Sequence, residues 1–235
     1  MYLCSGHVAT ALLDTNTLNN KETNVLALKD IQVFNQQEAL ISPFSATIEN
    51  GTILAVMGPS GIGKSTLLAY LADSLPAGMN GKGEIWLNDK PLNPLPAEKR
   101  QLGLLQQAPL LFPHMSVEEN IRFALPSNSP KHQRRELTMQ SLASVGLSEH
   151  ANKLPQHLSG GQQARLALAR TLSSQPNALL LDEPFSKLDQ SLRTDMRKLV
   201  LLAVKEHNIP AILVTHDPED ATAISHDTCY LSPAP

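Results

Sequence analysis

A glycine-rich segment at 58–66, Gly-Pro-Ser-Gly-Ile-Gly-Lys-Ser-Thr, carries the residue types that hold a chain of phosphates. Glycines allow backbone N–H groups to turn inward around a phosphate, and a helix that starts there adds partial positive charge. Lys64 is placed to reach the terminal phosphates, and the Ser65 hydroxyl is placed to ligate Mg²⁺. The segment predicts a nucleoside-triphosphate site, with a plain glycine-rich turn as the alternative. The residues expected to bind the phosphates are Gly58, Pro59, Ser60, Gly61, Ile62, Gly63, Lys64, Ser65 and Thr66.

Two acidic residues follow an apolar run at 178–181. Asp182 is expected to hold the Mg²⁺ shell, and Glu183 is expected to polarise a water for attack on the terminal phosphate. A strand that simply ends in a charged turn is the alternative. The glycine-rich segment upstream favours the catalytic interpretation, because a nucleoside-triphosphate site needs both a phosphate-binding loop and a metal-binding carboxylate.

The segment Leu158-Ser-Gly-Gly-Gln162 indicates a second special helix start. Ser159 and Gln162 fit a capping box, so a well-capped helix running through 164–172 is one interpretation. Capping alone does not require Gly160 and Gly161, and glycine costs about 1 kcal/mol against alanine inside a helix. The two glycines therefore favour close approach of an anion to the backbone N–H groups, and predict a second phosphate-binding helix end.

Four short apolar runs are typical of parallel strands that are buried on both faces. They lie at 53–57, 102–105, 178–181 and 211–214. The polar groups that follow them are the glycine-rich segment, Gln106, Asp182 with Glu183, and Thr215 with His216. Because ligands bind at the carboxyl edge of such a sheet, these groups are expected to form one site.

The remaining parts of the chain have other patterns. Alternating apolar and polar residues at 25–53 and again at 83–90 predict a small antiparallel sheet, with a turn at Asn50-Gly51. Between 115 and 157 the apolar spacing becomes helical, with a break at 126–130. Residues 1–24 show no sustained period and are expected to be a poorly structured tail.

Composition and charge exclude several classes of protein. A net charge of −3, with 1 Trp, 3 Tyr and 5 Phe, offers neither the basic field nor the stacking platform of a nucleic-acid-binding protein. No apolar run reaches the roughly 18 residues of a membrane span, and no export signal is visible. Cys4 and Cys229 form no disulfide or metal-binding pattern, which is typical of a cytosolic protein.

In their order and combination, these motifs resemble the nucleotide-binding subunit of an ATP-binding cassette (ABC) transporter, over about 25–230. The stretches 110–117 and 181–189 are most similar to bacterial binding-protein-dependent importers. The resemblance implies an α/β fold: a P-loop NTPase (RecA-like) core with an N-terminal antiparallel β subdomain and an inserted α-helical subdomain. It makes 25–235 one ABC ATP-binding domain, with the helical subdomain at about 107–160.

The resemblance also implies a role for each motif residue. The Walker A motif at 58–65 and the Walker B strand at 179–182 bind ATP and Mg²⁺, and Gln106 of the Q-loop joins Ser65 and Asp182 as a metal ligand. Glu183 is the catalytic glutamate, His216 the switch histidine and 186–189 the D-loop, with Lys64 also catalytic. The signature motif, which contacts the ATP held by a second copy of the chain, consists of Ser159, Gly160, Gly161 and Gln162. Phe34 is the candidate for stacking on adenine, and a buried core aromatic is the alternative.

The implied function is an ATP-hydrolysing subunit of a transporter, most similar to a bacterial importer. Its implied partners are a second copy of the chain, transmembrane permease subunits and, indirectly, an external solute-binding protein, but no nucleic acid. The implied location is the cytoplasmic side of the inner membrane, as a peripheral subunit. An exporter ATPase and a soluble ABC ATPase of DNA repair or translation are the alternatives. The stretch 110–117 is expected to contribute either to a permease-docking groove or to the core of the helical subdomain.

Overall fold

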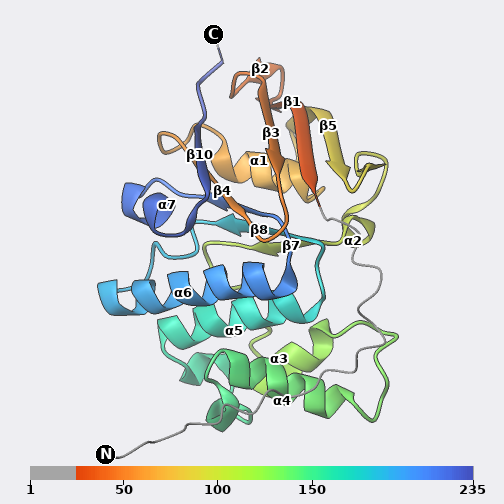
Figure 1. Cartoon of the computed structure of the whole chain (residues 1–235), viewed down its shortest axis with the longest axis vertical. Helices are drawn as coiled ribbons and strands as arrows, with labels where there is room; N and C mark the ends of the chain where they lie inside the picture. The colour runs from red at the N-terminus through yellow and green to blue at the C-terminus, as the bar shows by residue number, and fades with distance from the viewer. Residues whose placement is uncertain (1–24, 235) are drawn as a thin grey trace, which may run out of the picture.

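The structure is a computed structural model that describes residues 25–234. The tail predicted at 1–24, including Cys4, lies outside the described residues. Figure 1 shows the described elements in layers: an antiparallel sheet at the top, helix α1 beneath it, a parallel sheet in the middle, and helices α6, α5, α3 and α4 below. The layers place α1 between the two sheets.

The antiparallel sheet has the strand order β2-β1-β5-β6, and β3 also pairs with β1. Its strands are β1 (Leu26–Asn35), β2 (Glu38–Ala39), β3 (Phe44–Ile48), β5 (Met79–Leu87) and β6 (Lys90–Pro91). The pairing of β1 with β3 shifts register between Leu28 and Ile31, where Asp30 has a left-handed φ of 51°. Such a bulge changes which side of the strand faces the core, so the buried positions pass from 26 and 28 to 31 and 33.

The parallel sheet has the order β10-β4-β9-β8-β7, and every pairing in it is parallel. Its strands are β4 (Ile53–Met57), β7 (Leu102–Leu105), β8 (Ala178–Asp182), β9 (Ala211–Val214) and β10 (Asp227–Tyr230). The four strands predicted from apolar runs are confirmed. The sequence shows no comparable signal for β10, because this edge strand has mostly exposed side chains. All five strands end at one edge, and the polar groups that follow them therefore share that edge.

The turn predicted at Asn50-Gly51 is present, but it does not join two antiparallel strands. It connects β3 of the antiparallel sheet to β4, whose two neighbours are the parallel strands β10 and β9. The five residues of β4 are all buried, so this strand is stable only where both of its faces are covered. Gly51 has a φ of 66° and allows the chain to change sheets within a short turn.

The helices cover both faces of the parallel sheet and add a separate helical layer. They are α1 (Lys64–Leu71), α2 (Ala97–Arg100), α3 (Val117–Ala124), α4 (Arg134–Ser144), α5 (Gly160–Ser173), α6 (Gln190–His207) and α7 (Pro218–Ile224), with short 3₁₀ helices at Ser148–His150 and Pro155–His157. The helix expected to extend to residue 75 ends at Leu71, since Asp73 adopts a left-handed φ of 55°. Helices α3 and α4 pack on α5 around a core cluster of their own, which includes Val117, Ile121 and Leu142.

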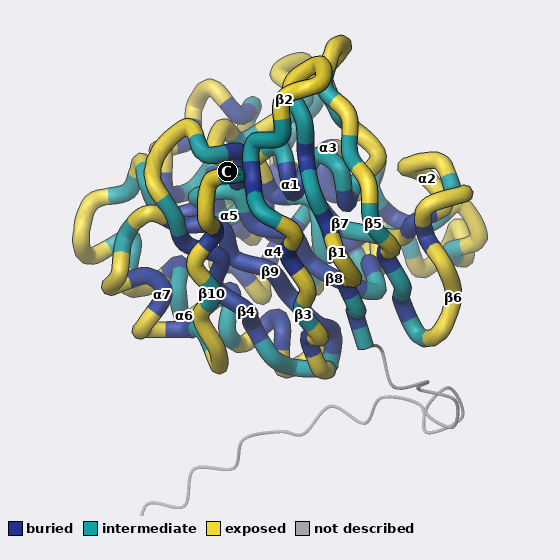
Figure 2. The backbone as a smooth tube through the Cα atoms, turned by 90° about the horizontal axis from the view of Figure 1, so that it is seen from above, coloured by how far each residue is buried: buried dark blue, intermediate teal, exposed yellow. Residues whose placement is uncertain are grey.

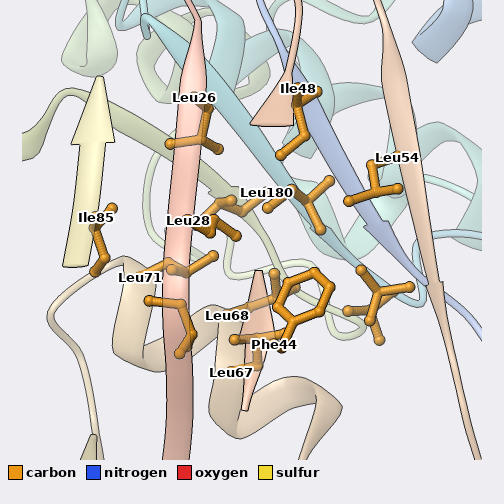
Figure 3. Close-up of a cluster of buried hydrophobic side chains, with 14 of the residues drawn as sticks. Leu26, Leu28, Phe44, Ile48, Leu54, Leu67, Leu68, Leu71, Ile85 and Leu180 are labelled. Carbon is orange, nitrogen blue, oxygen red and sulfur yellow. The ribbon is translucent and has the colours of Figure 1, made fainter. Parts of the chain in front are cut away.

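Side chains from the parallel strands alternate between two other core clusters. Leu54 and Leu180 point toward α1 and the antiparallel sheet, where they meet the leucines and isoleucines labelled in Figure 3. Ile53 and Leu181 point the other way, toward α5 and α6. Figure 2 shows the resulting pattern, with dark buried segments in the strands and exposed segments in the loops. The alternation explains why these strands have continuous apolar runs in the sequence.

Within residues 25–234, no helix combines the length and apolar character needed to cross a bilayer. Cys229 is a free thiol in β10, and burial raises its pKa.

Arg100 ties helix α2 to the end of helix α1. Its side chain is 3% exposed and donates to the carbonyl oxygens of Tyr70 and Leu71 at 2.9 and 2.8 Å. It donates as well to Leu95, and its guanidinium lies 3.2 Å from the Asp73 carboxylate. The Tyr70 and Leu71 carbonyls belong to the last turn of α1, whose carbonyl groups lack a donor within the helix; Tyr70 O also accepts from the Asp73 N–H beyond it. Arg100 therefore fixes the far end of the helix that begins in the glycine-rich segment.

We expect Arg100→Met to lower the free energy of unfolding by about 3 kcal/mol, because it removes the side-chain donor to the Leu71 carbonyl and the partner of Asp73. Urea unfolding of the purified chain measures this change. Lys99→Met is the matched control, since Lys99 is exposed on the same short helix. Equal midpoints for the two variants would show that Arg100 does not stabilise the end of α1.

Candidate active site

The glycine-rich segment leaves the end of β4 and turns into the first turn of α1. Gly63, the N-cap of α1, has a φ of 107°, and a Cβ at this position would lie 3.3 Å from Cβ of Leu40. The Lys64 side chain is buried, and its Nζ donates to the carbonyl oxygens of Gly58 and Pro59 at 2.8 and 3.0 Å. The segment is a tight loop whose cation lies among its own carbonyl groups.

Three residues predicted as metal ligands line one cavity of about 440 Å³: Ser65, Gln106 and Asp182. The Ser65 hydroxyl donates to Oδ1 of Asp182 at 2.9 Å. Burial raises the pKa of the Asp182 carboxyl; the hydrogen bond from Ser65 opposes this shift, whereas the nearby charge of Glu183 adds to it. Hydroxyl, carboxylate and amide oxygens are the donors that Mg²⁺ prefers, so the residues present fit this ion.

Glu183 and His216 are in direct contact. His216 Nδ1 lies 2.6 Å from Glu183 Oε2, and the two residues follow the neighbouring strands β8 and β9. Glu183 has a φ of 47°, a left-handed conformation that costs energy for a residue with a side chain. Its backbone N–H donates to Val214 O at 3.0 Å, which holds the chain in this turn. The sequence indicated both residues but not their contact, because the order of the strands in the sheet cannot be read from local sequence patterns.

The signature segment begins helix α5 with both hydrogen bonds of a capping box. The Ser159 hydroxyl oxygen accepts from the Gln162 N–H at 3.3 Å, and the Ser159 N–H donates to Gln162 Oε1 at 2.9 Å. The capping interpretation is therefore confirmed. Gly161 has a packing role that sequence reasoning missed, since a Cβ there would lie 2.9 Å from a methyl group of Leu192 on α6. Gly160 has nothing within 4 Å of that position and leaves the helix end open.

The signature segment does not line the cavity that holds Ser65 and Asp182. Gly160 instead lines a second cavity of about 240 Å³, together with Gln107, Pro184 and Lys187. Gln106 borders both cavities. The structure thus brings Lys64, the predicted metal ligands and the Glu183–His216 pair to one sheet edge. The signature segment instead borders the second cavity, which Gln106 shares with the first.

Phe34 lies on β1 and is only half-buried. It belongs to none of the hydrophobic core clusters among the described residues, and the ammonium of Lys82 lies 5.2 Å from its ring centroid. The alternative of a buried core aromatic is therefore wrong.

The loop at 183–189 contains contacts that sequence reasoning missed. The Ser186 hydroxyl donates to Glu183 O at 2.9 Å and accepts from Gln107 Nε2 at 3.2 Å. Asp189 caps helix α6 by accepting from the Leu192 N–H at 3.0 Å. An Asp immediately before a helix is a common capping residue, so the sequence could have indicated this cap. The bond between Ser186 and Gln107 depends on tertiary structure alone.

Comparisons with known proteins agree with this geometry. The profile of the family described as "ABC transporter" matches residues 41–186. The chain is 41% identical to "Uncharacterized ABC transporter ATP-binding protein YnjD" of Escherichia coli (strain K12), over 86% of this chain and 93% of that protein. It is 40% identical to "Thiamine import ATP-binding protein ThiQ" of Photobacterium profundum, over 83% of this chain and 80% of the relative.

A third relative is longer than this chain. "Putative 2-aminoethylphosphonate import ATP-binding protein PhnT" of Salmonella typhimurium is 37% identical over 91% of this chain, which spans 58% of that protein. The match of the family profile includes the glycine-rich segment, the signature and both carboxylates, and the α/β fold carries that segment between β4 and α1 as a P-loop NTPase does. The chain therefore belongs to the ABC transporter family, as one of its ATP-binding proteins.

Proposed function

We propose that this chain is the ATP-hydrolysing subunit of a bacterial ABC importer. The observation that carries the proposal is one sheet edge at which Ser65 bonds Asp182 and His216 contacts Glu183. Such a site offers a metal-binding pair next to a base and its partner. The printed names of several relatives favour import over the exporter and soluble alternatives: thiamine, 2-aminoethylphosphonate, spermidine/putrescine and Fe(3+) ions are named for import.

Each residue of the proposed site has its own role in ATP hydrolysis. Ser65, Asp182 and Gln106 would hold Mg²⁺, which supplies charge neutralisation at the phosphates. Lys64 binds the phosphates and the amide groups of the loop surround them. Glu183 accepts the proton of the attacking water, and His216 orients the Glu183 carboxylate through the contact at Oε2. Phe34, half-buried on β1, stacks on the adenine.

A second copy of the chain completes each site. The helix end at Ser159, Gly160 and Gly161 lies outside the cavity of Ser65 and Asp182, and Gly160 lines a separate one, which supports binding of the phosphate held by the partner. Gln162 keeps Ser159 in place as the N-cap. In this arrangement residues 25–235 form one ATP-binding domain, with the antiparallel sheet as one subdomain and about 107–160 as an inserted helical subdomain.

The helical layer offers a docking surface for a permease. Leu110 and Phe123 are 60% and 62% exposed, and Phe123 packs edge-on against Phe112 with centroids 4.9 Å apart. Val117, by contrast, is fully buried, so the stretch 110–117 serves both the surface and the core. Exposed apolar side chains next to the Q-loop support docking of transmembrane permease subunits, which would in turn receive solute from an external binding protein. The chain would then lie on the cytoplasmic side of the inner membrane.

Co-expression of the full chain with the membrane-protein genes beside its own tests the transporter function. We expect the chain to fractionate with membranes, to be retained by an affinity-tagged permease and to hydrolyse ATP in that complex. Hydrolysis by a chain that stays entirely out of the membrane fraction would instead support the soluble alternative.

Lys64→Ala should raise the dissociation constant for Mg-ATP at least tenfold, because it removes the cation that faces the phosphates, a charge-assisted contact worth about 1.4 kcal/mol or more. Titration calorimetry with ATP measures this change. Lys205→Ala is the matched control, since Lys205 is exposed near the end of α6. Unchanged affinity in the Lys64 variant would contradict the assignment of the phosphate site.

A further inference from the structure

Two arginines of helix α6 bind the segment that follows His216. The Arg193 guanidinium pairs with the Asp217 carboxylate, and Arg197 Nε donates to Asp220 Oδ1 at 2.7 Å. The side chains of Arg197 and Asp220 are 11% and 4% exposed. Neither arginine was indicated by the sequence motifs, and neither touches the cavity of Ser65 and Asp182.

The other neighbour of His216 is held by the same network. The Thr215 hydroxyl donates to Asp220 Oδ2 at 3.4 Å and accepts from the Asp217 N–H at 3.1 Å. The Thr215 N–H donates to Val56 O of β4 at 3.3 Å. His216 therefore stands between two residues whose positions are fixed, while its own side chain is 55% exposed and free to meet Glu183.

Helix α6 also begins close to Glu183. Asp189 caps its first turn, and the loop between 183 and 189 is closed by the bond from Ser186 to Glu183 O. One rigid helix thus connects, at its start, to the loop that carries Glu183 and, along its side, to the segment that carries His216. The contact of 2.6 Å between His216 and Glu183 thus joins two segments that are both connected to this helix.

The charges in the network support a positioning role. Burial works against ionisation of Asp217, yet the N–H of Glu219 and the charge of Arg193 lower its pKa, so the carboxylate stays charged and paired near neutral pH. A charged pair of this kind, held at low exposure by a planar guanidinium, fixes geometry better than a flexible surface pair does.

We propose that Arg193 and Arg197 are positioning residues that hold His216 against Glu183; this inference rests on the proposed ATPase function. Arg193 acts through Asp217, and Arg197 acts through Asp220 and Thr215. Loss of either arginine leaves the ATP site itself intact but loosens the contact between the base and its partner.

A double-mutant cycle tests the proposal in the full chain. Arg193→Met and Arg193→Lys are made in the wild-type and His216→Ala backgrounds, and release of labelled γ-phosphate is followed in single turnovers. We expect Arg193→Met to lower the rate about tenfold, with less than a twofold change in the ATP dissociation constant. We expect Arg193→Lys to recover part of the loss, and Arg193→Met to cost less than twofold once His216 is absent. An equal loss in both backgrounds would overturn the proposal.

Arg165→Met is the matched control, because Arg165 of α5 pairs with Asp195 of α6 at 3.2 Å, whereas Arg193 pairs with Asp217 in the segment after His216. Its rate should stay within twofold of the wild type. Arg197→Lys serves as the second test if Arg193→Met does not fold.

A spectroscopic measurement separates this proposal from the ATPase function. The ¹⁵N shifts of the His216 ring should report a hydrogen bond at Nδ1 in the wild type and its weakening in Arg193→Met, without any nucleotide. Unaltered shifts in Arg193→Met would overturn the positioning role, even if the wild type hydrolyses ATP. Altered shifts in a chain without ATPase activity would overturn the proposed function and leave the positioning of His216 supported.

Discussion

We expect replacement of Glu183 by glutamine to lower the rate of ATP hydrolysis about 10³-fold while ATP binding is retained. A glutamine side chain cannot take a proton from water, but its amide oxygen can still accept a hydrogen bond from His216 Nδ1. The substitution therefore removes the base with little change in the geometry of the contact at 2.6 Å. Phosphate release under saturating Mg-ATP measures the rate, and size-exclusion chromatography with ATP should show an accumulated dimer.

Glu206→Gln is the control for this variant, because Glu206 is an exposed carboxylate near the far end of α6. It should hydrolyse ATP at the wild-type rate. Near-normal turnover in the Glu183 variant would remove Glu183 from its role as base, and loss of the ATP-bound dimer would indicate damage to binding instead.

Gln162→Glu should lower hydrolysis about 10- to 100-fold without unfolding the chain. The structure contains the same capping box twice: Ser116 with Glu119 at the start of α3, and Ser159 with Gln162 at the start of α5. Glu119 shows that a carboxylate satisfies the box, since the N–H and hydroxyl of Ser116 lower its pKa. At α5, however, a carboxylate would place negative charge where the partner's phosphate is proposed to bind.

The contact of Gln162 with His150 is compatible with this substitution. Gln162 Nε2 lies 3.0 Å from His150 Nε2, and a glutamate can accept from the same ring nitrogen if the proton sits there. Turnover of ATP and the urea midpoint are measured together. Glu119→Gln, the opposite exchange at the other box, should leave turnover unchanged. Full activity of Gln162→Glu would show that this helix end does not face a phosphate.

The sequence predicts best what depends on local chemistry or burial. Continuous apolar runs identify β4 and β8 because both of their faces are covered, and the residues after them make up the candidate site. The pairing of strands is not encoded locally. The turn at Asn50-Gly51 has residues typical of a β-hairpin, but it joins two sheets. Contacts such as that of Gly161 with Leu192 form only when α5 packs on α6, and residue spacing along the chain does not predict them.

The contact between Glu183 and His216 illustrates the same limit at the site. Each residue follows a predicted strand, but their distance of 2.6 Å depends on β8 and β9 being neighbours. Arg193 and Arg197 are ordinary helical residues by sequence, and their partners lie 24 and 23 positions away. Side-chain pairs at such separations require the tertiary fold.

The strand order also has a consequence for how the protein is made. Ser65 and Asp182, 117 positions apart, bond across the sheet edge, yet β4 and β8 are not neighbours, because β9 lies between them. A ribosome delivers β9 after both flanking strands, since domains are synthesised from the N-terminus. Ser65 and Asp182, the proposed metal-binding pair, can meet in their final register only when residues 211–214 have emerged. We expect the nascent chain to stay without the complete proposed ATP site until β9 has been translated.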